Sequence, residues 1–368
     1  MDEKILDGIE NLTVFDSLIK ANSVLQISRK AMCSISGGSD SDIVLDIMTK
    51  VDDEKKVEYV WFDTGLEYKA TKEHLDYLEK KYNIKIRREK AIKPIPYSVR
   101  KYGVPFLSKH VSEMLERLQR HGFKWQDKPY EELAKEYPRC KSALKWWCNT
   151  KNDSKRKFSR FSIDYNKWLK EFIMQNPPDF PIAAKCCTYA KKNLGDKIMK
   201  EMGADMSIVG VRKAEGGVRA GAYKTCFTQE TKKGGSAFRP IFWYRDVDKL
   251  EYEKSFDITH SRCYTEYGLI RTGCVGCPFN RNITDELHII KEHEPNLYKA
   301  AMKIFGKSYE YTYKYREFVR MKNEEEKYGG GQLSFFSENL CHYETIRKEN
   351  VNESVKFIRR HKLWHGGT

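Results

Sequence analysis

The sequence lacks a secretory signal and any continuous apolar run of about 18 residues. A membrane-spanning helix needs such a run, so we expect a soluble cytoplasmic protein without a membrane partner. The sequence also lacks internal repeats, and three glycines at 329–331 are its one low-complexity stretch, which argues against a repeat architecture. With 368 residues, the chain is long enough for one large domain with insertions or for two domains.

The most informative segment is the loop at residues 36–41, which reads Ser-Gly-Gly-Ser-Asp-Ser and which we call the glycine loop. It follows a short apolar stretch at 31–35 and precedes the apolar positions of a helix at 43–48, so it is expected to join a strand to a helix. Glycines permit close approach, and a helix N-terminus directs backbone N–H groups at an anion. The loop has no lysine of the GxxxxGK(S/T) kind, which disfavours an ordinary nucleoside triphosphatase. We therefore predict a phosphate-binding loop, and the alternative is a simple turn before a helix.

A second loop, the DTG loop of Asp63, Thr64 and Gly65, follows a strand predicted at 57–62. An amphipathic helix is predicted at about 67–82 and a third strand at 84–88, which gives a βαβαβ order. In open parallel sheets, ligands bind beyond the carboxyl ends of the strands. Both loops fall there, so we expect them to share one site.

Ten cysteines in a cytoplasmic protein indicate metal binding or redox chemistry rather than structural disulfides. Cys186 and Cys187 are adjacent, and Cys274 and Cys277 form a CxxC pair after 86 intervening residues. Four thiolates suit zinc or an iron–sulfur cluster. Adjacent cysteines point in different directions, which favours the larger centre, a 4Fe–4S cluster. The alternative is a buried cysteine pair with a separate zinc knuckle.

The two loops resemble the phosphoadenylyl-sulfate (PAPS) reductase superfamily, whose members share an SGGxDS loop and a DTG element after the next strand. The CC pair followed much later by CxxC is similar to the cluster-containing sulfonucleotide reductases. The resemblance implies an α/β fold of the Rossmann-like adenine nucleotide alpha hydrolase (PP-loop) type with a parallel sheet. It also implies an adenine nucleotide on the loops, either ATP, adenylyl sulfate (APS) or PAPS. The cluster ligands implied by the resemblance are Cys186, Cys187, Cys274 and Cys277.

Further segments extend the resemblance from residue 31 to about residue 280. After a strand predicted at 206–211, Arg212, Glu215 and Arg219 resemble the family's GxRxxExxxR element, with Gly216 where the family usually has serine. Segments at 240–247 and 267–278 resemble its PxxxWxxxDVW and YxxGxxRxGCxxCP elements. Two arginines can hold a phosphate or sulfate through bidentate hydrogen bonds. The predicted nucleotide-binding residues are Ser36, Gly37, Gly38, Ser39, Asp40, Ser41, Asp63, Thr64, Gly65, Arg212, Glu215 and Arg219.

We expect three parts: a helical segment at 1–30, a PP-loop domain at 31–280, and a helical C-terminal region with a tail at 281–368. Within the PP-loop domain, a helical insertion is predicted at about 95–180. The insertion is basic and aromatic, and it either shapes the substrate entrance or is a cover without substrate contact. Four further cysteines are candidate metal ligands or buried thiols: Cys140, Cys148, Cys226 and Cys263.

The formal charge is +15, and basic residues cluster at 155–160 and 359–360. The first cluster is interleaved with aromatic residues, namely Trp146, Trp147, Phe158 and Phe161. Such a cluster can bind a nucleic acid, can attract a polyanionic nucleotide, or can be an ordinary solvated surface. Nucleic acid is therefore one candidate partner.

Three functions compete on this scaffold. In the first, which we favour, the chain resembles the ATP-pyrophosphatase component of DNA phosphorothioation systems. ATP then binds with Mg²⁺, Asp40 and Asp63 place the metal or the nucleotide, and a donor protein supplies sulfur to an activated acceptor such as nucleic acid. In the second, the chain is a sulfonucleotide reductase that releases sulfite from APS or PAPS, with an electron donor and with Cys341 as nucleophile. The Glu and Gly of the family's ECGLH motif are absent around Cys341. The third is a non-catalytic nucleotide-binding module in a DNA-modification or defence system.

Overall fold

The computed structural model describes residues 3–150, 159, 161–216, 221–229 and 235–328. These residues belong to two compact units, Met1–Lys314 and Tyr315–Thr368. The second unit begins within helix α15 (Pro295–Tyr328), and the structure describes it as far as residue 328. The sheet, the two loops and the four paired cysteines all belong to the first unit.

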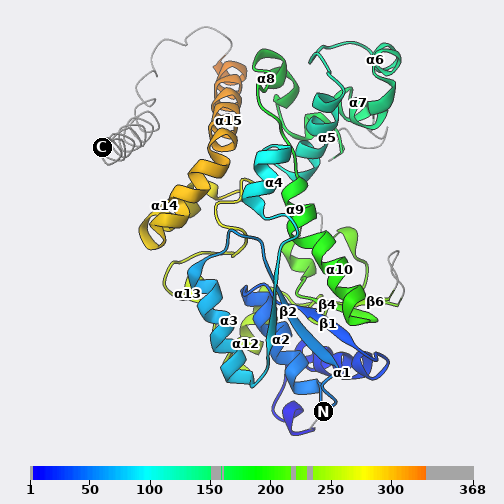
Figure 1. Cartoon of the computed structure of the whole chain (residues 1–368), viewed down its shortest axis with the longest axis vertical. Coiled ribbons are helices and arrows are strands. Elements are labelled where there is room, and N and C mark those ends of the chain that lie inside the picture. Colours follow the sequence, from blue (N-terminus) through cyan, green and yellow to red (C-terminus); the bar gives the residue numbers. More distant parts are fainter. Residues whose placement is uncertain (1–2, 151–158, 160, 217–220, 230–234, 329–368) are drawn as a thin grey trace, which may run out of the picture. The chain divides into compact units, whose positions relative to one another are not determined.

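A mixed six-stranded sheet forms the centre of the first unit, with the strand order β3-β2-β1-β4-β6-β5 (Figure 1). Five strands are parallel, and β5 runs antiparallel to β6. The strands are β1 (Ala31–Ser34), β2 (Val57–Asp63), β3 (Ile86–Lys90), β4 (Met206–Val209), β5 (Phe227–Thr228) and β6 (Ser236–Phe238). The predicted α/β class with a parallel sheet is confirmed. The order of the strands reverses at β1, between β2 and β4, and a switch point of this kind is where such sheets bind ligands.

The third strand begins two residues later than the sequence predicted. Asn83 ends the preceding helix in the left-handed conformation, and the Ile84 N–H still donates to the carbonyl of Glu79. The chain is therefore still turning at Ile84, and the ladder with β2 begins at Ile86.

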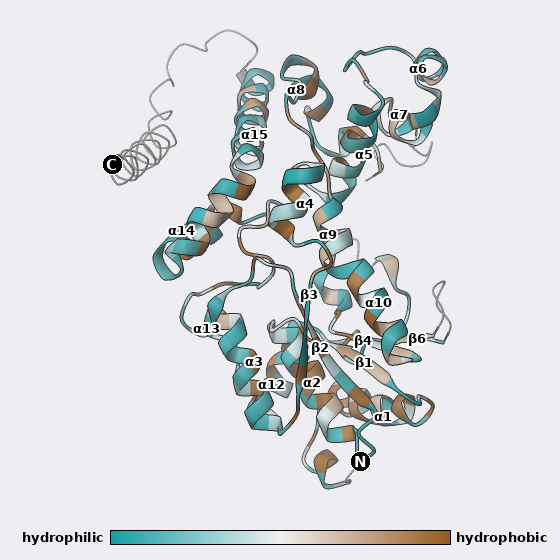
Figure 2. Ribbon diagram, in the orientation of Figure 1, coloured by the Kyte–Doolittle hydropathy of each residue, from teal (hydrophilic) through white to brown (hydrophobic). Residues whose placement is uncertain are grey.

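Helices cover both faces of the sheet, because successive strand residues point to opposite sides. Cys33 and Trp61 pack into one apolar cluster with the helices α1 (Leu12–Gln26), α2 (Ser39–Val51), α3 (Lys69–Tyr82) and α12 (Asp246–Ser255). Met32 and Val60 pack on the other face against α10 (Asn193–Met202). Figure 2 shows hydrophobic residues along β1, β2 and the adjoining helices.

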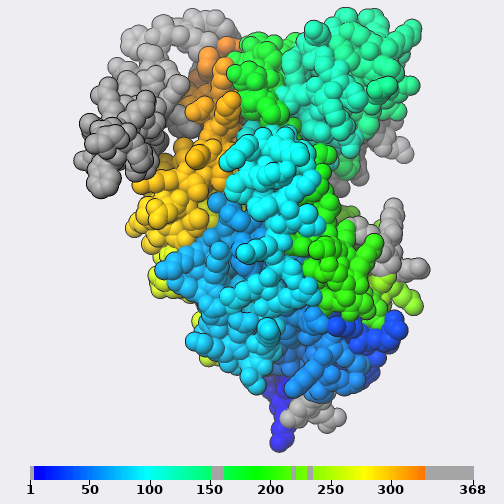
Figure 3. Space-filling view, viewed as in Figure 1, coloured from blue at the N-terminus to red at the C-terminus, as the bar shows by residue number. Residues whose placement is uncertain are grey.

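Where the structure describes the range predicted as an insertion, it has five α-helices: α4 (Ile95–Tyr102), α5 (Lys109–Arg120), α6 (Tyr130–Glu136), α7 (Lys141–Trp147) and α8 (Leu169–Gln175). Trp146 and Trp147 are fully buried and hold α7 in place, so they are not surface rings available to stack on bases. The interpretation of these two tryptophans as part of a surface cluster is therefore wrong. Figure 3 shows α4 (cyan) beside α9 (Lys185–Cys187, green), and the two helices contact each other.

A third apolar cluster lies beyond the carboxyl ends of β2 and β3. It joins Leu66 and Ala91, which follow those strands, to Cys186, Cys263 and Val275. Residues of α3, α4, α13 (Arg262–Thr265), α14 (Ile283–His293) and the first part of α15 also belong to it. Cys186, Cys187 and Cys274 are thus placed beyond the carboxyl edge of the sheet.

The remaining short elements are turns of helix. The 3₁₀ segments are Glu3–Leu6, Pro138–Cys140, Ile163–Tyr165 and Lys213–Glu215, and Thr188–Lys192 is a π-helical turn between α9 and α10. In the described part of the chain, no helix combines the length and the apolar character needed to cross a membrane.

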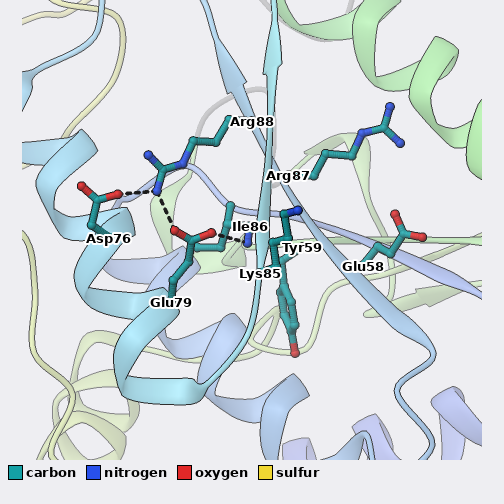
Figure 4. Close-up of a pocket in the computed structure, with 8 residues that line it drawn as sticks. All are labelled: Glu58, Tyr59, Asp76, Glu79, Lys85, Ile86, Arg87 and Arg88. Carbon is teal, nitrogen blue, oxygen red and sulfur yellow. Dashed lines mark hydrogen bonds and ion pairs between the residues drawn. The ribbon is translucent and has the colours of Figure 1, made fainter.

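A cavity of about 720 Å³ lies at the edge strand β3, away from both loops (Figure 4). It is lined by charged side chains that already have partners, since Arg88 donates to Asp76 and Glu79 of α3. The Glu79 carboxylate also accepts from the Ile86 N–H. These contacts connect the edge strand to α3. Arg88, Asp76 and Glu79 already pair with one another, so none of them offers an unpaired charge to a ligand in this cavity.

Candidate functional site

The glycine loop joins β1 to α2, as the sequence predicted. Gly37 has a φ of +70°, and a Cβ on it would lie 2.6 Å from the Thr71 side chain, so only glycine fits. The Ser41 hydroxyl is buried, accepts from the Gly38 N–H at 3.1 Å and donates to the Gly38 carbonyl at 2.7 Å. Ser41 therefore fixes the shape of the loop, and the hydroxyl of Ser36 donates to it as well.

Asp40 lies between two cations on the first turn of α2. Lys249 of α12 approaches its carboxylate to 2.9 Å and donates to the Ser39 hydroxyl. Arg212 donates to Asp40 at 3.1 Å and to Asp246 at 2.7 Å. Burial raises the pKa of Asp40, but Lys249 and Arg212 outweigh burial, so the pKa lies below its usual value. Asp40 is therefore a carboxylate that holds two cations at the glycine loop.

The loop after β4 reaches the glycine loop because Gly210 allows the two backbones to approach. A Cβ on Gly210 would lie 3.2 Å from the Asp40 carbonyl oxygen and 3.3 Å from the Ser41 nitrogen. This approach places Arg212 beside Asp40, and Glu215 also contributes to lowering the pKa of that carboxyl group. Arg219 lies outside the described residues.

The DTG loop begins at the carboxyl end of β2. The Asp63 carboxylate accepts from the Gly65 N–H at 2.9 Å, and its other oxygen lies 3.9 Å from the Lys72 ammonium group. Thr64 is fully buried, and its hydroxyl donates to Glu67 at 2.5 Å. Burial raises the pKa of Glu67, although Lys191 opposes this shift.

The DTG loop contacts the segment Cys274–Cys277, which we call the CxxC loop. The Thr64 hydroxyl lies 3.7 Å from the Cys274 sulfur, and the Val275 N–H donates to the Leu66 carbonyl at 3.0 Å. The structure thus brings one predicted nucleotide-binding loop into contact with one predicted pair of metal ligands.

The four predicted metal ligands lie together and interact electrostatically. The Cys186 thiol hydrogen bonds to Cys187, which raises the pKa of Cys186 and lowers that of Cys187 to about 6, with Lys109 and Lys191 adding to the lowering. Burial raises the pKa of Cys274, and it raises that of Cys277 to about 12.

The donor set fits a four-thiolate centre. Cys186 belongs to the third apolar cluster, and Cys187 and Cys274 pack against it. Lys191, which is itself exposed, has a raised pKa chiefly because of Cys274, so it offsets the negative charge that thiolates would carry. Among the described residues, no three His, Cys, Asp or Glu side chains converge closely enough to share one metal ion. Thiolates ligate both zinc and iron–sulfur clusters, so by their chemistry the four cysteines suit either kind of centre.

Buried polar contacts fix the CxxC loop. Glu286 of α14 accepts from the Gly276 N–H at 3.0 Å and from the Tyr68 hydroxyl at 2.6 Å. The Tyr309 hydroxyl donates to the Gly276 carbonyl. Gly276 has a φ of +63°, and a Cβ there would lie 2.8 Å from that of Ala301. The loop is therefore preset by helices α14 and α15.

The remaining predicted positions lie apart from this site or outside the described residues. Cys341, the predicted nucleophile of the reductase, lies outside the described residues. Cys140 is a buried thiol of the insertion, whereas Cys263 is a buried thiol of the third apolar cluster, 3.7 Å from the Thr71 hydroxyl, and burial raises the pKa of each. Cys226 is half-buried beside β5, and its carbonyl accepts from the Arg239 N–H.

The sequence analysis missed three side chains of the site. Lys249 and Tyr264 reach the glycine loop from segments more than 200 positions away in the chain, and neither belongs to a recognisable motif. Lys191 follows Cys187 by four residues, and this helical spacing was a signal that could have identified it.

Solved structures with a similar chain course include PAPS reductase from Candida auris, at 12% identity and a TM-score of 0.39 over 74% of this chain and 93% of that chain. Another is the tRNA thiolase NcsA from Methanococcus maripaludis with its 4Fe–4S cluster, at 11% identity and a TM-score of 0.36 over 84% of this chain and 81% of that one. At these TM-scores, the likeness assigns no activity to this chain.

Sequence comparisons give one partial match and one extended match. A stretch of 104 residues is 33% identical to an uncharacterized protein of Methanocaldococcus jannaschii, and it spans 28% of this chain and 21% of that protein. Residues 30–280, more than half of the chain, match the phosphoadenosine phosphosulfate reductase domain. With its glycine loop, DTG loop and neighbouring cysteines inside that range, the chain belongs to the phosphoadenosine phosphosulfate reductase domain family.

Proposed function

We propose that the chain binds an adenine nucleotide on the glycine and DTG loops beside a 4Fe–4S cluster, and that it uses ATP to activate an acceptor for sulfur transfer. The observation that carries this proposal is the contact of the DTG loop with the CxxC loop, through Thr64 and Cys274 and through Leu66 and Val275. A nucleotide on the first loop would thus be a neighbour of the cysteines.

The charge at the glycine loop supports an anionic ligand. Lys249 and Arg212 lie at the loop and both contact the Asp40 carboxylate, while Glu253 and Asp246 also pair with them. The start of α2 adds backbone N–H groups and the positive end of its dipole. The side chains of Lys249 and Arg212 are only 16% and 11% exposed, so solvent screens them little.

The proposed reaction is transfer of adenylate to an acceptor. A nucleophilic oxygen of the acceptor attacks the α-phosphorus of ATP, an oxygen–phosphorus bond forms, and the bond to the bridging oxygen breaks with release of pyrophosphate. A sulfur nucleophile from a donor protein then displaces AMP from the activated acceptor. Asp63 is better suited than Asp40 to hold Mg²⁺ on the phosphates, because Asp40 is already engaged by two cations.

The proposed cluster ligands are Cys186, Cys187, Cys274 and Cys277. A 4Fe–4S cluster held by all four thiolates would supply electron transfer, and sulfur could bind to an iron only where one of these thiolates left it. Lys109 and Lys191 lower the cost of placing thiolates in an apolar cluster, and the Thr64 hydroxyl oxygen lies 3.7 Å from the Cys274 sulfur. We also propose the cytoplasm as the compartment, because free thiols are maintained where the environment is reducing.

Reduction of APS or PAPS is a second candidate, favoured by the family match over residues 30–280. In that case, Arg212 and Arg219 would hold the sulfate, and Cys341 would attack its sulfur. The acceptor, the donor and the nucleophile distinguish the two functions, whereas the nucleotide loops are common to both.

The deciding experiment is anaerobic incubation with ATP, APS and PAPS in parallel, with Mg²⁺, a thiol donor and candidate acceptors. We expect pyrophosphate from ATP and its loss in Asp63→Asn, while Asp16→Asn, an exposed carboxylate on α1, serves as the matched control. Sulfite from APS or PAPS would instead establish the reductase. Tight nucleotide binding without either product would indicate a non-catalytic binding module.

The cluster is tested by purifying the protein anaerobically and measuring iron, sulfide and absorbance near 400 nm, which is typical of thiolate-bound iron–sulfur centres. We expect Cys186→Ser to lose iron and colour, whereas Cys140→Ser, a buried thiol in the insertion, keeps both. A colourless protein with one zinc ion would contradict the proposal.

Nucleic acid is the proposed acceptor class, and α7 with the turn before it offers a basic surface. Arg139, Lys141 and Lys145 are exposed there, while the basic residues at 155–157 and 160 lie outside the described residues. The log of the affinity for a DNA duplex falls with the log of the salt concentration. Changing these three basic residues to Gln should make that negative slope shallower by about 2 to 3. Changing three exposed lysines elsewhere, Lys20, Lys55 and Lys80, is the control. An unchanged slope in the first variant would exclude this surface.

A further inference from the structure

The Tyr264 hydroxyl occupies a donor that an anion on the glycine loop would use. Ser39 is the first residue of α2, and its N–H is one of those a helix leaves unpaired at its start. This N–H donates to the Tyr264 hydroxyl at 3.2 Å. A phosphate or sulfate oxygen that takes the Ser39 N–H must therefore displace the phenol or share the donor with it.

The same hydroxyl holds the chain that leads to the CxxC loop. It accepts from the Thr272 N–H at 3.2 Å and lies 3.0 Å from the Thr272 hydroxyl. Thr272 also packs on the glycine loop, because a Cβ on Gly38 would lie 3.0 Å from its hydroxyl oxygen. Only Gly273 separates Thr272 from Cys274. One phenol oxygen thus joins the start of α2 to the first cysteine of the CxxC loop.

We propose that Tyr264 is a positioning residue that couples anion binding on the glycine loop to the setting of the CxxC loop. The proposal rests on the nucleotide binding proposed above and adds its regulation. A charged oxygen is a stronger acceptor than a neutral phenol, so a bound nucleotide takes the Ser39 N–H. The Tyr264 hydroxyl then turns from Ser39 and carries Thr272 with it, which shifts the backbone at Cys274.

A purely structural tyrosine would behave differently. Loss of its hydroxyl would change stability or affinity, but it would not separate the response of the CxxC loop from nucleotide binding. The test therefore reads the backbone of residues 262–280 directly and does not depend on turnover or on the presence of a cluster.

The experiment is hydrogen–deuterium exchange with mass spectrometry on the full chain, with and without ATP. The variant is Tyr264→Phe, which removes only the hydroxyl, and the matched control is Tyr165→Phe, an exposed tyrosine of the insertion that is 60% exposed. Without ATP, Tyr264→Phe should speed exchange at Thr272 roughly five- to tenfold, because its N–H loses an acceptor. With ATP, the wild type and the control should change exchange both at 36–41 and at 272–277. Tyr264→Phe should respond at 36–41 alone.

Binding of ATP is measured separately by equilibrium dialysis, so that two failures can be told apart. If ATP binds and the response at 272–277 persists in Tyr264→Phe, or is missing in the wild type, the coupling is wrong while nucleotide binding stands. If neither ATP nor APS binds to the wild type, nucleotide binding is wrong and the coupling falls with it. Unchanged exchange at Thr272 in ligand-free Tyr264→Phe would show that the hydroxyl does not hold that segment.

Discussion

His260 provides a quantitative test of the polar network beneath the glycine loop. Its Nδ1 lies 2.8 Å from the Asp42 carboxylate, and its Nε2 lies 2.8 Å from that of Glu253. His74 Nε2 lies 3.1 Å from Asp42, and the Lys249 ammonium group lies 3.7 Å from Glu253. His260 is thus held between two carboxylates that connect α2 to α12.

Protonated His260 stabilises the fold over a defined pH range. Burial lowers the pKa of His260, but the hydrogen bonds to Asp42 and Glu253 outweigh burial and raise the pKa from 6.5 to about 9. Because the folded pKa is the higher one, the stabilisation is fully present below pH 6.5 and is lost as the pH rises through about 9. At about 1.4 kcal/mol per pH unit, this range corresponds to about 3 kcal/mol of unfolding free energy.

The assay is urea unfolding of the wild type and of His260→Gln at several pH values from 6 to 10. We expect the variant to be less stable at pH 6 by up to about 3 kcal/mol, because the buried Asp42 and the half-buried Glu253 have lost their charged partner. The difference should narrow by about 1.4 kcal/mol per pH unit above pH 6.5 and level off beyond pH 9. The control is His288→Gln, an exposed histidine of α14. Stability curves of the wild type and His260→Gln that stay parallel from pH 6 to 10 would refute the reasoning.

Two further predictions concern the CxxC loop and the glycine loop. Gly276→Ala should destabilise the protein by about 2 kcal/mol or more, from the positive φ and the approach to Ala301, whereas Gly306→Ala in α15 should stabilise it by up to about 1 kcal/mol. Thermal melts check this pair, and a neutral Gly276→Ala would contradict the description of the loop as preset. Lys249→Gln should weaken ATP binding about tenfold because the glycine loop loses a cation, while Lys254→Gln, exposed on the same helix, should not. Titration calorimetry checks it, and equal affinities in the two variants would remove Lys249 from the site.

The sequence predicted the parts of the site that follow from chain order. The glycine loop and the DTG loop each come directly after an apolar strand, and parallel strands bring their carboxyl ends to one edge. The pairing of Ala31 with Val57 and with Met206 then places three predicted loops side by side. The predicted ends of the strands were less accurate. Asn83 ends α3 in the left-handed conformation and delays the start of β3, and Gly210, which lies against the Asp40 backbone, follows the end of β4.

The rest of the site depends on tertiary contacts that no local pattern encodes. Lys249 belongs to α12, which is mostly polar, and Tyr264 to the four-residue α13, and only the packing of these helices brings the two side chains to Ser39. The buried Trp146 and Trp147 were misinterpreted for a related reason. A short helix with exposed lysines can turn its large rings inward, and residue type alone does not give that direction.

The π-helical turn at Thr188–Lys192 determines how far Cys186 and Cys187 are rotated, about the helix axis, relative to the helix α10 that follows. A π turn holds one residue more than an α turn in the same rise, so deleting a residue there would rotate Cys186 and Cys187 by about 100° relative to α10. Helix α10 is fixed on the sheet by Leu194 and Ile198, so it cannot follow that rotation without losing its apolar contacts. The extra residue therefore reconciles two demands on one continuous helical stretch: an apolar face for the sheet and thiols directed at the CxxC loop.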